Sequence, residues 1–182
     1  MKELSLNILD IAENSVKADA ALTEIAIKEF EDKLILTITD NGCGMTEETL
    51  KTVTDPFYTT RTTRKVGMGL PLLKMQAELT GGSLKVSSKH ISVYPDEHGT
   101  CVCAEFNKNH IDFTPLGDVV STITTLIQGH PEKDFLFTHT TESGEVSLDT
   151  RELRMVLEDL PLNTYEVIKW IEENLNEQYL MG

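Results

Sequence analysis

The chain opens with apolar residues at helical spacing. Across residues 5–18, apolar positions recur three and four apart, at Ile8, Leu9, Ala12 and Val16. This spacing predicts a helix with one apolar face, and Ser5 is the residue expected to cap its N-terminus. Residues 23–30 and 33–39 then alternate apolar and polar positions around an acidic turn, which predicts a β-hairpin.

The same pattern continues through the first half of the chain. A short helix is expected over 46–53, capped by Thr46, and a longer one over 68–80, ended by a pair of glycines. The strands expected after these helices cover 83–88, 91–94 and 100–107. A sheet with helices on one face follows, so the predicted fold class is α+β, a two-layer α/β sandwich.

After a polar connector the pattern changes. The segments expected there are a helix over 116–127, a hairpin from 134–138 and 145–148, and helices over 150–157 and 164–175. We therefore divide the chain into a first domain, 1–108, and a small mixed α/β C-terminal extension, 109–182. The extension is small for an independent core, so it either docks on the first domain or forms a homodimer with a second copy.

Charge excludes some partners. The formal net charge is −14, so nucleic acid and anionic membranes would be repelled. No signal peptide and no long apolar span is recognised, and the three cysteines do not form a disulfide framework. A cytoplasmic location is expected. A phosphate ligand would need local cations and backbone amides to overcome the overall charge.

Candidate chemistry begins on the first helix. Asn7, Asp10, Asn14 and Lys17 are spaced three and four apart and share one face. A solvated polar stripe explains this equally simply. The residue types nevertheless suit a nucleotide site, because an Asn oxygen can bind Mg²⁺, Asp can orient a water and Lys can pair with phosphate.

Two glycine-containing segments are further candidates for a nucleotide site. Asp40 ends a strand and precedes a loop through Met45, whose glycines allow close approach of a planar ligand; a plain Asn-Gly turn is the alternative. The second segment, Gly67-Met68-Gly69-Leu70, stands just before a helix, where free amides can bind an anion. Arg61, Arg64 and Lys65 precede it and either close over a triphosphate or form a solvated loop.

Taken in order, these segments resemble the N, G1, F and G2 boxes of the GHKL superfamily of gyrase, chaperone, histidine kinase and MutL ATPases. The resemblance covers about residues 1–108. The boxes are Asn7–Ala18, Asp40–Met45, Asp55-Pro56-Phe57-Tyr58-Thr59-Thr60 and Gly67–Leu70, with His98-Gly99-Thr100 similar to the step that opens the family's last strand. The resemblance implies the Bergerat-type fold and binding of ATP with Mg²⁺.

The resemblance also implies roles for single residues. Asn14 would hold Mg²⁺, Asp40 would accept the adenine amino hydrogen, and Phe57 would anchor a lid over the nucleotide. The other residues implied in ATP binding are Lys17, Gly42, Gly44, Met45, Arg64, Lys65, Gly67, Met68, Gly69, Leu70 and Thr100.

Where the sequence differs from the family pattern, the reaction that the chain carries out with ATP stays open. Gyrase-like members have Glu four residues before the Mg²⁺-binding Asn, where this chain has the shorter Asp10. No phosphoacceptor histidine on a helical hairpin is recognised. We expect a stand-alone histidine-kinase-like ATPase or protein kinase acting on a separate protein, with Asp10 as the catalytic group. The alternative is a nucleotide-gated binding module with little turnover.

Overall fold

The computed structural model describes residues 3–55 and 68–182. Several residues discussed above lie outside this part of the chain, and they are Arg61, Arg64, Lys65, Gly67 and the F-box residues Pro56–Thr60. Among the helices in the described residues, none combines the length and the apolar character needed to cross a membrane.

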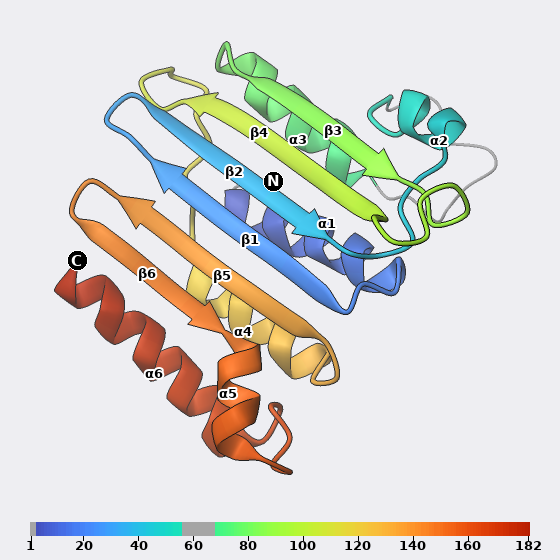
Figure 1. The fold of residues 1–182 in the computed structure, drawn as a ribbon. Coiled ribbons are helices and arrows are strands. Elements are labelled where there is room, and N and C mark those ends of the chain that lie inside the picture. Colours follow the sequence, from blue (N-terminus) through green and yellow to red (C-terminus); the bar gives the residue numbers. More distant parts are fainter. Residues whose placement is uncertain (1–2, 56–67) are drawn as a thin grey trace.

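Six strands and six helices are seen in these residues (Figure 1). The first-half elements are α1 (Leu4–Lys17), β1 (Leu22–Glu29), β2 (Lys33–Asp40), α2 (Glu47–Thr52), α3 (Gly69–Leu79), β3 (Ser83–Lys89) and β4 (Gly99–Asn107). The second-half elements are α4 (Val119–Gly129), β5 (Asp134–Thr141), β6 (Gly144–Asp149), α5 (Thr150–Leu157) and α6 (Tyr165–Met181). The predicted α+β sandwich is confirmed.

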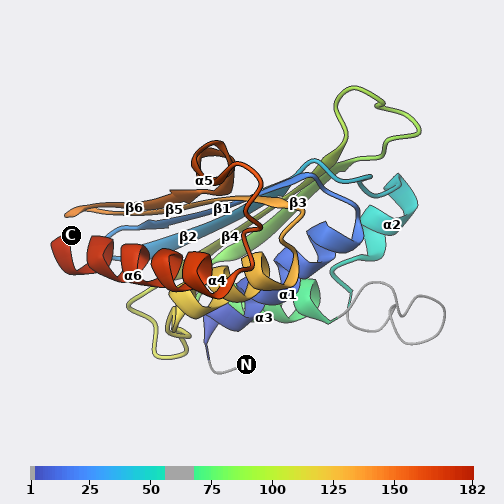
Figure 2. The same cartoon turned by 90° about the horizontal axis from the view of Figure 1, so that it is seen from below.

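All six strands belong to one sheet in the order β3-β4-β2-β1-β5-β6. Neighbouring strands are antiparallel, except that β5 runs parallel to β1. Figure 2 shows α1, α3, α4 and α6 on one side of the sheet and α5 on the other. The C-terminal extension therefore lengthens the sheet of the first half and adds helices to the same layer.

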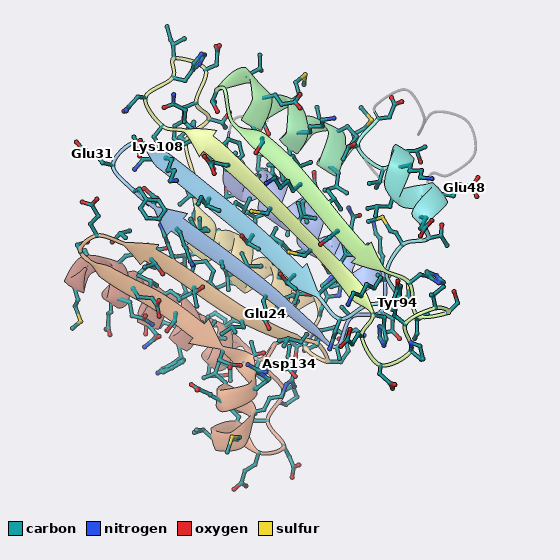
Figure 3. All side chains as sticks on the ribbon, turned by 45° about the horizontal axis from the view of Figure 1, so that its top comes forward. Glu24, Glu31, Glu48, Tyr94, Lys108 and Asp134 are labelled. Carbon is teal, nitrogen blue, oxygen red and sulfur yellow. The ribbon has the colours of Figure 1, made fainter. Side chains whose placement is uncertain are left out.

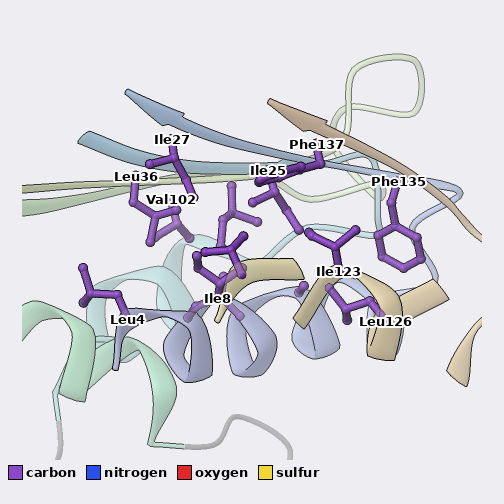
Figure 4. Packing of buried hydrophobic residues seen from close by; sticks show 14 of the residues in the cluster. Leu4, Ile8, Ile25, Ile27, Leu36, Val102, Ile123, Leu126, Phe135 and Phe137 are labelled. Carbon is purple, nitrogen blue, oxygen red and sulfur yellow. The ribbon is translucent and has the colours of Figure 1, made fainter. Parts of the chain in front are cut away.

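The core lies between the sheet and its helix layer (Figure 4). In β1, Ile25 and Ile27 point to this side and are fully buried, while the alternating Glu24 and Lys28 are exposed. Helices α1 and α4 contribute buried residues from below, including Ile8 and Ile123. Strand alternation thus explains the apolar face that α1, α3, α4 and α6 cover.

The other face of the sheet carries charged side chains. Glu24 and Asp134 lie near the same end of β1 and β5, and Lys108 lies near the opposite end (Figure 3). Arg154 of α5 donates to Asp134 at 2.7 Å. Helix α5 is therefore anchored to this side by charge-assisted hydrogen bonds.

Two helix starts differ from the predictions. Helix α1 has Glu3, not Ser5, at its N-cap, and Ser5 is buried inside the helix. The carbonyls of Pro115 and Leu116 accept from the Leu4 and Ser5 N–H groups at 2.9 and 2.8 Å, so a distant segment caps the helix. Helix α4 begins at Val119 rather than 116, because Asp118 caps it by accepting from Ser121 N–H.

The strand predicted over residues 91–94 is wrong. These residues form turns in which the His90 carbonyl accepts from both Val93 and Tyr94 N–H. The β-branched residues there are exposed on a loop rather than paired in the sheet. Apolar composition alone was misleading, because pairing partners decide whether such a run becomes a strand.

Candidate functional site

A cavity of about 550 Å³ opens between α1, the ends of β2 and β4, and the start of α3. Apolar side chains form much of its wall, and a few polar groups stand among them. The lining residues are Ile11, Asn14, Ser15, Lys17, Ala18, Ile38, Asp40, Gly44, Met45, Val53, Leu70, Thr100 and Val102. An apolar cleft of this size with few polar groups is typical of a small-molecule site.

Asp40 is the polar group held most firmly in this cavity. One carboxylate oxygen, Oδ1, accepts from the Gly42 N–H at 2.9 Å. The other, Oδ2, accepts from the Ser15 hydroxyl at 2.7 Å. These two donors, one from the following loop and one from α1, fix the orientation of the carboxylate.

The loop after Asp40 is tied to its surroundings on both sides. Cys43 N–H donates to the Ala18 carbonyl at 2.9 Å, at the end of α1. Gly44 has a φ of +71°, and a β-carbon there would overlap the carbonyl of Lys89. Only glycine gives both this backbone conformation and this close approach to β3 without strain.

A pair of hydroxyls, from Ser88 of β3 and Thr100 of β4, lies on the strands next to Asp40. Ser88 Oγ accepts from the Met45 N–H at 2.7 Å and lies 2.8 Å from Thr100 Oγ1. Ser88 also donates to the Gly99 carbonyl at 3.0 Å. The loop from Asp40 to Met45 is thereby attached to the beginning of β4.

Helix α1 presents Asn14 and Lys17 to the cavity. Within the described residues, neither side chain has a hydrogen-bond or ion-pair partner. Asn7 differs from the expected polar stripe, because it is fully buried and its amide atoms have no hydrogen-bond partner in the described part of the chain.

Asp10 stands one turn before Asn14 and is exposed. Partial burial raises the pKa of its carboxyl above the usual 3.8, Lys17 opposes this change and Glu13 adds to it. Its β-carbon lies close to Gly69, because a β-carbon on Gly69 would be 3.3 Å from it. The start of α3 and the Asp10 side of α1 therefore face one another.

Most of the predicted residues in the described part meet at this cavity. Its lining includes Asn14, Lys17, Asp40, Gly44, Met45, Leu70 and Thr100. Gly42 supports Asp40, while Gly69 and Asp10 lie close to one another but are not among the residues that line the cavity. Met68 instead lines a second cavity of about 500 Å³ on the outer side of α3.

Several lining residues were not predicted from the sequence. Ile38 and Val102 lie two positions from Asp40 and Thr100 on the same strands, so strand alternation could have found them. Ser15 follows Asn14 directly, but its bond to Asp40 spans 25 positions. No local pattern in the sequence signals such a contact.

About half of this chain is similar in sequence to parts of longer known proteins. Sporulation kinase E of Bacillus subtilis (strain 168) is 34% identical over 90 residues, which are 49% of this chain and 12% of that protein. The signal transduction histidine-protein kinase AtoS of Escherichia coli (strain K12) is 33% identical over 91 residues, 48% of this chain and 14% of that protein. The chain therefore matches only a small part of these longer relatives.

A solved structure shares the fold. The N-terminal domain of a DNA repair protein aligns with a TM-score of 0.53 and 16% identity, covering 82% of this chain and 52% of that one.

The family model of histidine kinase-, DNA gyrase B- and HSP90-like ATPases matches residues 2–110. That span contains α1, the loop after β2, the start of α3 and β4, which together form the cavity. The chain thus belongs to the family of histidine kinase-, DNA gyrase B- and HSP90-like ATPases.

Proposed function

We propose that this chain binds Mg·ATP in the cavity and uses it as an ATPase or as a protein kinase acting on a separate protein. The observation that carries the proposal is Asp40, an acceptor held by two donors in the lining of an apolar cleft. An ionised carboxylate accepts hydrogen bonds and cannot donate one. It therefore suits the 6-amino group of adenine, and the apolar wall suits the base itself.

The phosphate end of the nucleotide would lie toward the start of α3. Helix N-termini attract anions through free N–H groups and the helix dipole. Lys17 lines the cavity and adds a positive charge. These local features offset the unfavourable net charge of −14.

Asn14 is the residue proposed to hold Mg²⁺. Its side chain lines the cavity and makes no hydrogen bond within the described residues, so its amide oxygen is free for a metal. Mg²⁺ in nucleotide sites takes few protein ligands and completes its shell with phosphates and water. The donor set therefore fits this ion, which would neutralise phosphate charge when bound.

Asp10 is proposed as the general base. It would accept the proton of a water molecule or a target hydroxyl as that oxygen attacks the γ-phosphorus, and the bond to the β-phosphate oxygen would break to leave ADP. The raised pKa of its carboxyl makes it a better proton acceptor than a typical exposed Asp. Its position beside Gly69 brings it to the proposed phosphate end.

A nucleotide-gated binding module remains the second candidate. Asp10 is exposed and makes no side-chain hydrogen bond to a described residue, so nothing in this part of the chain orients its carboxylate. A base that is not oriented gives little rate acceleration. In this candidate, ATP binding alone would change which surface meets a partner protein.

Purified protein with γ-labelled ATP and Mg²⁺, alone and with lysate, separates these reactions. Released labelled phosphate indicates an ATPase, label on another protein indicates a kinase, and label that stays as bound ATP indicates a binding module.

Asp10→Asn should keep ATP binding within about twofold and lower turnover at least ~100-fold. Equal loss of binding and turnover would contradict the assigned role.

A further inference from the structure

Ser15 occupies an unusual place for a serine on a packed helix. It is only 2% exposed, yet it is one of the residues that line the cavity. A buried hydroxyl needs a hydrogen-bond partner to offset its lost hydration. The identity of that partner determines what the hydroxyl can offer to a ligand.

Two acceptors lie within reach of this hydroxyl. The Asp40 carboxylate oxygen Oδ2 is 2.7 Å away, and the Ile11 carbonyl within the same helix is 3.5 Å away. The shorter bond has a charged acceptor, so the serine proton is directed at Asp40. Because a carboxylate cannot donate, this bond cannot reverse its direction.

The Thr100 hydroxyl, at the strand position paired with Asp40, also has a defined direction. Ser88 donates its single hydroxyl hydrogen to the Gly99 carbonyl, so Thr100 donates in the 2.8 Å bond between the two hydroxyls. Thr100 therefore offers only lone pairs to a ligand. Of these two acceptors Asp40 is the charged one, and its orientation depends on Ser15.

We propose that Ser15 is a specificity-determining positioning residue, which holds Asp40 as a fixed acceptor for the 6-amino group of adenine. This inference rests on the proposed ATP binding. With Gly42 N–H on Oδ1 and Ser15 on Oδ2, the carboxylate has one orientation and presents only remaining lone pairs. A 6-oxo purine would place an acceptor against that acceptor. Without Ser15, the carboxylate loses one of its two anchors and can turn away from the base.

The test compares ligands that differ only at position 6. Binding of ATP and of purine riboside 5′-triphosphate, which lacks the 6-amino group, is measured by titration calorimetry with Mg²⁺. Ser15→Ala should weaken ATP about tenfold and leave purine riboside triphosphate within about twofold of wild type, because only ATP uses the fixed acceptor. Ser5→Ala is the matched control, since Ser5 is equally buried on α1 but donates to Glu3.

A second substitution distinguishes loss of the hydrogen bond from a packing defect. Ser15→Cys fills nearly the same space with a weaker donor, and it should also lower ATP affinity while retaining purine riboside triphosphate. Equal losses for both ligands in the Ser15 variants, or unchanged ATP affinity, would overturn the role of Ser15. A wild-type protein that binds neither ligand would instead refute the proposed function.

Discussion

Asp10 and Asp40 are two carboxylates with different surroundings. Asp40 accepts hydrogen bonds from two protein donors. Asp10 has no side-chain hydrogen bond to a described residue, and partial burial raises the pKa of its carboxyl. A carboxylate with two fixed donors suits recognition, whereas a raised pKa makes the Asp10 carboxylate the better proton acceptor.

A buried histidine gives a prediction at the same scale. His139 Nε2 donates to Glu29 at 3.0 Å, and Tyr179, whose hydroxyl pKa is raised to about 12 by burial, donates to Nδ1 at 2.7 Å. Burial lowers the pKa of the His139 imidazole below its usual 6.5, although Glu29 opposes this; Lys108 lowers it further. Below pH 6.5 the unfolded chain therefore binds more protons than the folded one, so stability is lost as the pH falls through this range.

Urea unfolding at a series of pH values from about 5.5 to 8 measures this loss. Wild type should lose unfolding free energy at the acid end, and His139→Gln should lose clearly less. An identical pH dependence in both proteins would show that His139 does not titrate in this way.

At the scale of elements, the loop after β2 depends on one glycine. Gly44 combines a positive φ with direct contact to the Lys89 carbonyl. The loop also depends on Ser88 through the Met45 N–H. Any shift of this loop would move the acceptor groups that face the cavity.

Gly44→Ala should destabilise the protein by roughly 1–3 kcal/mol, because it adds backbone strain and a steric overlap. It should also weaken ATP binding, since the loop must move away from β3. Gly81→Ala is the control: Gly81 also has a positive φ, of +83°, but a β-carbon there meets nothing within 4 Å. Calorimetry and urea unfolding of both variants should show weakened ATP binding for Gly44→Ala alone. Equal ATP affinities would argue against coupling between loop and cavity.

Local sequence patterns predicted individual elements but not the contacts between them. Alternation predicted β1 and β2, and Thr46 caps α2 as expected by accepting from Thr49 N–H. Contacts between distant segments were not predictable. The cap of α1 by Pro115 and Leu116, and the pairing of β5 with β1, depend on which segments meet in three dimensions. Local periodicity carries no information about that choice.

At the scale of the whole molecule, both halves of the chain share one sheet and one core. Strand β1 lies between β2 and β5, and α4 packs beside α1. Phe135 and Phe137 of β5 are buried in the same cluster as Ile25 of β1. The family match ends at residue 110, but the core continues beyond it.

Removal of residues 109–182 should therefore leave a chain that does not fold cooperatively. The truncation would expose the edge of β1 and the flank of α1, and exposed strand edges favour aggregation. Circular dichroism and urea unfolding of residues 1–108, compared with the full chain, measure the effect. A cooperative transition with full-chain stability in the truncated protein would contradict this view.

The central claim is that Asp40 accepts a hydrogen bond from the 6-amino group of adenine when ATP binds in this cavity. Titration calorimetry of Mg·ATP into wild type and Asp40→Asn tests it most directly. An amide has only one acceptor oxygen for the Gly42 and Ser15 donors and for the base. The substitution should therefore weaken ATP binding by about 10- to 100-fold. Equal affinity in the two proteins, or no ATP binding by wild type, would contradict the account.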